Sequence, residues 1–211
     1  SIRTIADLER LCALAARNRA REPIRFQRLV DLFDVDRRTI RDSYLSVLEK
    51  LFILTSVTEY DNQRPRSTRL YLRDTGLVSA LENKTPLEAL DDLDYEADLA
   101  RIAGFDHTMR LAYGINAAQG HAAAPSVQYW RGRGGEVDYV FEVGDTPVPV
   151  ALAYRPSTHQ TKLDVLAEFR NQYQAPVGLL VSGDTSGRIN PIEQRDDDVI
   201  ELPYWLYLLL C

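Results

Sequence analysis

Apolar side chains recur at helical spacing in three stretches of the first fifty residues. A repeat of i, i+3, i+4 and i+7 places such residues on one face of a helix, where they can pack against a core. The three sets are Ile5, Leu8, Leu11, Cys12 and Ala15; Phe26, Leu29, Val30 and Phe33; and Ile40, Tyr44, Val47, Leu48 and Leu51. These sets predict three amphipathic helices.

The second and third of these helices are predicted to form a helix-turn-helix, because only a tight turn separates Phe33 from Asp36, whose carboxylate can cap the third helix. The segments 52–59 and 68–72 then carry strand-type residues around a loop with two arginines. Three helices followed by a β-hairpin are the elements of a winged helix. We therefore expect a winged helix-turn-helix over residues 1–81, which includes a short helix at 74–81.

Residues 95–211 show a different pattern, in which apolar strands alternate with helices. The predicted elements are a helix at 95–113, strands at 127–130, 137–143 and 147–154, a helix at 163–173, strands at 177–182 and 199–202, and a helix at 203–210. The order α-β-β-β-α-β favours a mixed sheet with helices on both faces, and it is the order of a restriction-endonuclease-like (PD-(D/E)xK-type) α/β domain. The acidic stretch 82–94 is predicted to be a linker between two modules.

The two halves of the chain carry opposite charge. Residues 1–74 contain 15 Lys/Arg and 11 Asp/Glu, whereas residues 75–211 contain 10 and 20. A basic first half favours contact with phosphates. The predicted DNA-binding residues are those of the third helix and the wing: Arg37, Arg38, Thr39, Arg41, Arg64, Arg66 and Arg69. The alternative is a solvated face in which Arg38 and Asp42 neutralise each other one turn apart, on a winged helix that docks proteins.

Composition adds limits on location. The longest apolar run, Trp205–Leu210, is too short to cross a bilayer, so no membrane partner is expected. Cys12 and Cys211 share no motif spacing, which predicts reduced thiols in a cytoplasmic protein. Only three of the 25 basic residues are lysines. An arginine-rich, acidic chain is typical either of a salt-adapted (halophilic) organism or of a GC-rich genome.

The strand segment around Asp138 has the spacing of a metal-dependent nuclease but lacks part of its chemistry. In such a core, an acid on one strand and an acid-x-Lys triplet on the next hold Mg²⁺ and stabilise the reacting phosphate. Asp138 stands at the first position, with Glu136 beside it, while the triplet reads Ala151-Leu152-Ala153. The sequence therefore predicts a nuclease-like scaffold without catalysis or a bound metal. Asp138 is expected to cap a backbone group or to pair with Arg131 or Arg133. The spacing of His107, His121 and His159 does not suit a metal site either.

Five motifs in order resemble the uncharacterised C-terminal region of prokaryotic, especially archaeal, AAA-type P-loop ATPases. They are Arg69-Leu-Tyr-Leu-Arg-Asp74-Thr-Gly-Leu77, Tyr129-Trp-Arg131, Glu136-Val-Asp138-Tyr-Val140, Pro149-Val-Ala-Leu-Ala-Tyr154 and the winged-helix pattern before them. The resemblance implies a helix acid at Asp106, or else at Glu96 or Asp98. It also implies an ATPase domain upstream as partner, and a start at Ser1 rather than Met agrees with an excised piece. ATP and Mg²⁺ are expected only in that missing domain, and no cofactor in this chain.

Three functions follow as hypotheses. The leading one is a non-catalytic region that binds double-stranded DNA and regulates or positions an AAA-type ATPase. The second is a protein-interaction or antitoxin-like regulatory module that does not touch DNA. The third is a residual Mg²⁺-dependent nuclease that uses Asp138.

Overall fold

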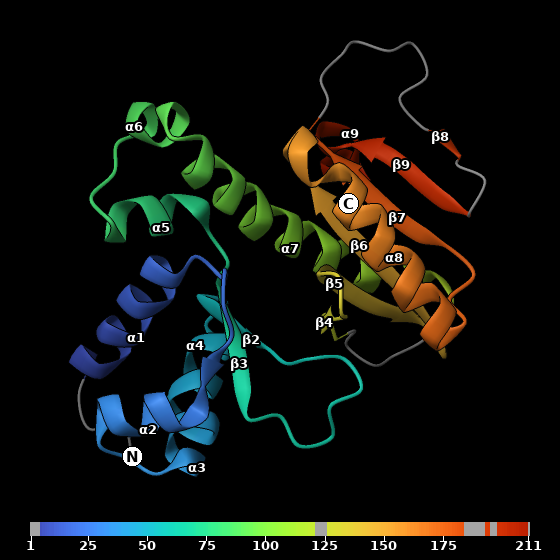
Figure 1. Cartoon of the computed structure of the whole chain (residues 1–211). Helices are drawn as coiled ribbons and strands as arrows, with labels where there is room; N and C mark the ends of the chain where they lie inside the picture. The colour runs from blue at the N-terminus through green and yellow to red at the C-terminus, as the bar shows by residue number, and fades with distance from the viewer. Residues whose placement is uncertain (1–4, 121–125, 184–192, 195–197, 211) are drawn as a thin grey trace. The chain divides into compact units, whose positions relative to one another are not determined.

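The computed structural model describes residues 5–120, 126–183, 193–194 and 198–210. The chain divides into two compact units, residues 1–103 and 104–211, and the division falls within one helix (Figure 1). Each unit carries its own sheet, one of three strands and one of six. The expected mixed α/β class is confirmed.

The first unit combines a helical layer with a small antiparallel sheet. Its elements up to the end of the sheet are α1 (Ile5–Asn18), β1 (Ile24–Arg25), α2 (Phe26–Phe33), α3 (Arg37–Thr39), η1 (Ile40–Leu45), α4 (Ser46–Lys50), β2 (Leu54–Val57) and β3 (Ser67–Leu72). The strand order is β1-β3-β2, and both pairings are antiparallel. The three predicted helices and the two-stranded hairpin are thus present. The two-residue strand β1 is an addition that is too short to leave a pattern in the sequence.

The third predicted helix is a continuous helical run over residues 37–50 with a π-helical middle, η1. Its N-cap is Asp36, as predicted, because the carboxylate accepts a hydrogen bond from the Thr39 backbone at 2.9 Å. Ile40 and Tyr44 are fully buried, and the Tyr44 ring packs edge-on against Phe33 at 5.7 Å. The predicted apolar faces are longer than the buried faces only at their ends. Ile5 and Leu51 are exposed, so their expected burial is wrong.

The segment predicted as a linker, 82–94, is helical for much of its length. Helix α5 (Thr75–Leu81) is followed by α6 (Pro86–Asp91) and then by the long helix α7 (Leu93–Ala118). Asp74 caps α5, and a reciprocal capping box between Thr85 and Glu88 begins α6. Gly104 lies within α7 without interrupting it, because one glycine in a helix interior costs only about 1 kcal/mol.

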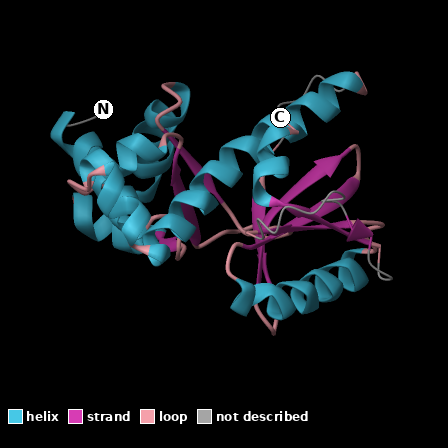
Figure 2. Ribbon diagram, turned by 90° about the horizontal axis from the view of Figure 1, so that it is seen from above, coloured by secondary structure: helices cyan, strands magenta, loops and turns pink. Residues whose placement is uncertain are grey.

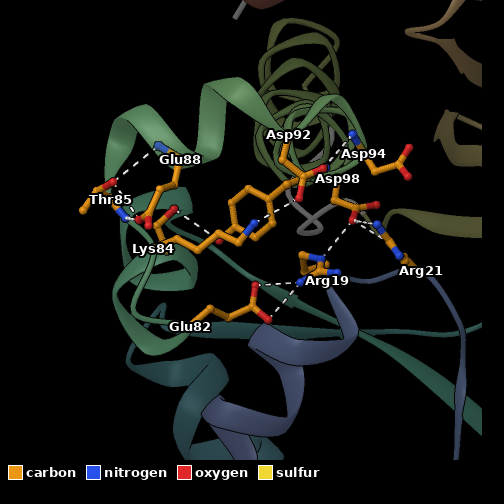
Figure 3. Close-up of polar contacts among 11 residues, drawn as sticks. Arg19, Arg21, Glu82, Lys84, Thr85, Glu88, Asp92, Asp94 and Asp98 are labelled. Carbon is orange, nitrogen blue, oxygen red and sulfur yellow. Dashed lines mark hydrogen bonds and ion pairs between the residues drawn. The ribbon is translucent and has the colours of Figure 1, made fainter.

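An ion cluster explains why the first eleven residues of α7, 93–103, belong to the first unit. The Asp98 carboxylate accepts hydrogen bonds from Arg19 at 2.9 Å and from Arg21 at 2.6 Å (Figure 3). It also accepts one from Arg101 at 2.9 Å. Arg19 also donates to both oxygens of Glu82. Burial disfavours the charge of Arg19, but these hydrogen bonds outweigh it and raise the pKa of the guanidinium. The cluster ties α7 to the end of α1, which places the division between the units later than the acidic stretch suggested.

The second unit is built on a six-stranded mixed sheet. Its strands are β4 (Gln128–Arg131), β5 (Glu136–Val143), β6 (Thr146–Ala153), β7 (Gly178–Ser182), β8 (Glu193–Gln194) and β9 (Val199–Pro203). Their order is β4-β5-β6-β7-β9-β8. The strands β6, β7 and β9 run parallel, whereas the β4–β5, β5–β6 and β8–β9 pairs are antiparallel. The predicted strands of this half are therefore confirmed, and β8 is an additional short edge strand.

Helices cover both faces of this sheet, as Figure 2 shows. On one face, Gly104 in α7 approaches Tyr139 and Leu152, and the Phe105 ring lies 6.2 Å from that of Tyr139. On the other face lies α8 (His159–Tyr173), which follows the short helix η2 (Pro156–Thr158) and meets the sheet at Gly178. The last helix is α9 (Tyr204–Leu209), whose Tyr207 hydroxyl lies 2.6 Å from that of Thr108. The expected arrangement of helices on both faces is present.

The burial of the strand aromatic residues and of Cys12 agrees with the sequence. The aromatic residues of β4 and β5 are all buried, as predicted, and the set is Tyr129, Trp130, Tyr139 and Phe141. Cys12 is a free, buried thiol, and burial raises its pKa.

Within the part of the chain that the structure describes, no helix has both the length and the apolar character that a bilayer crossing needs.

The residue directly after β7 is a glycine that no larger residue can replace without movement of its neighbours. A Cβ atom on Gly183 would lie 2.1 Å from the carbonyl oxygen of Tyr154. We expect Gly183→Ala to lower the free energy of unfolding by about 2 kcal/mol in urea denaturation, because backbone must shift to admit the methyl group. The matched control is Gly134→Ala, where nothing lies within 4 Å. Equal stability of the two variants would contradict the close approach.

Candidate functional sites

The first candidate site is the surface shared by α3 and the loop between β2 and β3. Arg37 joins the two, because its guanidinium donates to the Pro65 carbonyl oxygen at 2.5 Å and lies 4.5 Å from the centre of the Phe26 ring. Through this contact, the loop that corresponds to the predicted wing lies against the start of the third helix. Arg37 thus has a positioning role in addition to its charge.

Two predicted arginines project from this helix into solvent but share one carboxylate. Arg38, whose side chain is 87% exposed, pairs with Asp42 at 3.4 Å, as the alternative in the sequence predicted. Arg41 donates to the same carboxylate at 2.8 Å. The hydrogen bond from Arg41 is the main reason that the pKa of Asp42 is lowered. Asp42 therefore stays ionised at neutral pH and offsets part of the positive charge.

Thr39 is turned inward on its own helix rather than toward a ligand. Its hydroxyl donates to Asp36 at 2.8 Å, and its backbone N–H donates to the same carboxylate. The backbone hydrogen bond is the main cause of the lowered pKa of Asp36. The two residues form a helix cap, so Thr39 is engaged in local structure.

In the β2–β3 hairpin, some of the predicted DNA-binding residues are exposed and one is buried. Arg64 and Arg66 are exposed in the loop between the two strands. Arg69, in β3, is fully buried and donates to the Arg21 carbonyl oxygen at 3.2 Å. A side chain buried in the sheet cannot reach a phosphate, so the prediction of Arg69 as a DNA-binding residue is wrong. Arg69 is paired with the buried Val57 of β2, and paired residues on neighbouring strands face the same side of a sheet. Arg69 therefore faces the core.

The second candidate site surrounds Asp138, which lies on the face of the large sheet that α8 covers. Its side chain is 3% exposed, and its Oδ2 atom accepts hydrogen bonds from the Leu152 backbone N–H at 2.8 Å and from the Lys162 ammonium at 2.5 Å. Lys162 also donates to the Glu136 carbonyl oxygen at 2.9 Å. The expected cap of a backbone group is confirmed. The expected partner, Arg131 or Arg133, is wrong, because Lys162 takes that place.

The strand register continues this site across the sheet. Ala151 of β6, Leu180 of β7 and Glu201 of β9 are paired in one row. Continuing the β5–β6 register by one residue beyond Tyr139 and Val150 places Asp138 at the end of this row. At the far end of the row, Glu201 bonds His159 of α8 at 2.9 Å. The first turn of α8 thus presents one basic side chain to each of two carboxylates.

The remaining residues of the nuclease pattern do not gather around Asp138. Asp106 pairs with Arg110 on α7, the helix that covers the opposite, Tyr139-bearing face. The Glu136 carboxylate pairs across the strands with Arg131 at 3.0 Å. Asp98, the alternative helix acid, binds the arginine cluster of the first unit. Ala151 and Ala153 are buried.

Among the described residues, no three His, Cys, Asp or Glu side chains are grouped to hold a metal ion. His121 lies outside the described residues.

Lys162 was missed by the sequence analysis. A signal was available, since lysine is rare in this chain and Lys162 directly precedes the predicted helix 163–173, with His159 three residues before it. Residues three apart share a helix face. Whether this face meets Asp138 and Glu201 depends on how the helix packs on the sheet. The spacing of residues along the sequence does not specify that packing.

A family model described as "Domain of unknown function (DUF8612)" matches residues 1–88. The match spans α1 to the start of α6 and so includes the three-stranded sheet. It covers less than half of the 211 residues. Neither the curated proteins nor the solved structures gave a match.

Proposed function

We propose that the first unit is a winged helix that binds duplex DNA weakly through α3 and the β2–β3 loop. The support for the fold is the order of elements, helix, strand, helix, helix, strand, strand, with the strand order β1-β3-β2. In winged helices, the last helix of the trio enters the major groove and the hairpin loop reaches the backbone. Here that helix begins at Arg37 and that loop contains Arg64 and Arg66.

The main support for DNA binding is the contact between α3 and the β2–β3 loop. The contact between Arg37 and the Pro65 carbonyl oxygen holds the loop against the helix. The exposed Arg38 and Arg41 of the helix and the exposed Arg64 and Arg66 of the loop therefore border one surface. Guanidinium groups that project from a helix and an adjacent loop can pair with successive phosphates of a duplex.

The charge of the unit limits the affinity that this surface can reach. Residues 1–103 contain 17 Lys/Arg and 18 Asp/Glu, because the acidic residues of α6 and α7 offset the basic first 74. Asp42 competes with phosphate for Arg38 and Arg41. The positive field is thus local, and dissociation constants in the non-specific range of roughly 10⁻⁴–10⁻⁶ M are expected.

Charge-matched variants test the proposal. Arg38→Gln/Arg41→Gln and Arg64→Gln/Arg66→Gln should each weaken binding to a fluorescent duplex by about tenfold at low salt, because each removes two phosphate contacts. Binding is measured by fluorescence anisotropy with the whole chain.

The matched control is Arg17→Gln/Arg133→Gln, which changes the net charge equally at two exposed positions on other elements, α1 and the turn between β4 and β5. Parent-like binding is expected for this control. If all three double variants bound alike, the chain would attract DNA only through its overall charge, and the assigned surface would be wrong.

For the second unit, we propose a restriction-endonuclease-like scaffold that does not cleave DNA. Support comes from the order of its elements and from Ala151 and Ala153, which supply neither a metal ligand nor a cation beside Asp138. The motif order further suggests that the chain works as the regulatory C-terminal region of an AAA-type ATPase, in the cytoplasm. ATP and Mg²⁺ would then bind the ATPase domain.

A second candidate function, protein docking, is favoured by an apolar surface on α6 and the start of α7. Leu87, Leu90 and Leu93 are 76%, 64% and 69% exposed. Acidic residues flank them at Glu88, Asp91 and Asp94. Charge complementarity points to a basic amphipathic helix of another protein as the occupant. The arginine variants separate the two functions, since this surface contains none of those arginines.

A further inference from the structure

The Lys162 ammonium lies where a small cation would be bound by oxygen atoms. It donates to Asp138 Oδ2 at 2.5 Å and to the Glu136 carbonyl oxygen at 2.9 Å. Carboxylate and carbonyl oxygens are also the ligands that Mg²⁺, Mn²⁺ and Ca²⁺ prefer. The carboxylate is almost completely buried, and the lysine side chain is 17% exposed.

We propose that Lys162 is a built-in cation that permanently occupies an oxygen site formed by Asp138 and the Glu136 carbonyl. The site is thereby closed to divalent ions, and the buried charge of Asp138 is neutralised by the chain itself. This inference concerns the second unit and does not depend on DNA binding by the first.

Charge balance favours an ammonium over a divalent ion at this position. The immediate neighbours of Asp138 in its strand row are Ala151 and then Leu180, which carry no charge. One carboxylate and one ammonium sum to zero. A divalent ion on the same carboxylate would leave one net positive charge, so it competes poorly with the ammonium, although it can still bind the carboxylate when the ammonium is absent.

The choice of lysine in an arginine-rich chain supports this role. Only three of 25 basic residues are lysines, and one of them meets this buried carboxylate. An ammonium is a compact charge with three donors, whereas a guanidinium is a broad planar fork. A compact cation can contact one carboxylate oxygen and one carbonyl oxygen of the same strand at once.

Removing the ammonium while keeping the apolar stem should expose the site to metal. In Lys162→Met, we expect the melting temperature to fall by roughly 5–10 °C and millimolar Mn²⁺ to restore about 5 °C of it. The parent should shift by less than about 1 °C under the same conditions. The control Lys162→Met/Asp138→Asn lacks the buried charge, so it should melt above the single variant and not respond to Mn²⁺.

The parent protein provides a second test that does not require the variant to fold. With ¹⁵N-labelled lysine, the three ammonium groups give separate NMR signals, and the Lys162 signal should stay sharp as Mn²⁺ is added. Paramagnetic broadening of this signal that Asp138→Asn abolishes would overturn the proposal, because Mn²⁺ would then bind at Asp138 in the parent. A folded Lys162→Met variant without any Mn²⁺ response would also overturn it.

Discussion

Replacing Asp98 with alanine is expected to lower the free energy of unfolding of the first unit by about 3 kcal/mol. Its buried carboxylate is the common partner of Arg19, Arg21 and Arg101. Removal leaves Arg19, whose side chain is 19% exposed, with Glu82 as its remaining carboxylate partner. Arg21 and Arg101 lose their ion pair with Asp98 as well. Because Arg21 is nearly half exposed, water replaces part of its lost interaction, which places the effect at the lower end of the range for buried pairs.

Two optical signals can assign this effect to the correct unit. Both tryptophans, Trp130 and Trp205, belong to the second unit, so urea unfolding followed by tryptophan fluorescence reports that unit. Far-ultraviolet circular dichroism also reports the helices of the first unit. Asp98→Ala should lower the dichroism midpoint, while the exposed control Asp91→Asn should not. A shift confined to the tryptophan signal would contradict the assignment of Asp98 to the first unit.

In the second unit, the largest expected effect is that of Phe169→Ala, about 4 kcal/mol. Phe169 is fully buried on the inner face of α8. Its ring lies 5.3 Å from that of Trp130 and 4.7 Å from that of Tyr173. The change removes an aromatic side chain from a packed cluster and leaves a cavity between α8 and the sheet.

Tryptophan fluorescence measures this variant directly, because Trp130 is one of the two neighbours. The unfolding midpoint in urea should fall strongly, and the folded-state emission should change as well. Leu209→Ala, at an exposed position of α9, is the control and should stay within about 0.5 kcal/mol of the parent. Similar losses in both variants would indicate that α8 does not pack on Trp130 as described.

Local pattern predicted most helices and strands because their burial follows a simple period. Helices 26–33 and 37–50 carry apolar residues on one face, and strands β5 to β7 are buried on both faces and read as apolar runs. The Asp36 cap was predictable because the first backbone N–H groups of a helix lack partners within the helix. A carboxylate directly before the helix can accept a hydrogen bond from one of them.

What the sequence did not predict depends on contacts between distant residues. The division between the units moved from 82–94 into α7 because Asp98 binds arginines 77 and 79 residues away. Arg69 was assigned to the surface by its charge, although its strand neighbours are buried on both sides. Lys162 meets Asp138 across 24 residues, and only the packing of α8 on the sheet brings them together.

The salt dependence of DNA binding tests the central proposal most directly, because it measures how many phosphates the chain contacts. For the parent chain, a plot of log K against log salt should be linear with a slope of about −3 to −4, as four arginines require. In the fourfold variant Arg38→Gln/Arg41→Gln/Arg64→Gln/Arg66→Gln, the slope should approach zero. Undetectable binding of the parent at low salt, or the same slope in both proteins, would contradict DNA binding by this surface.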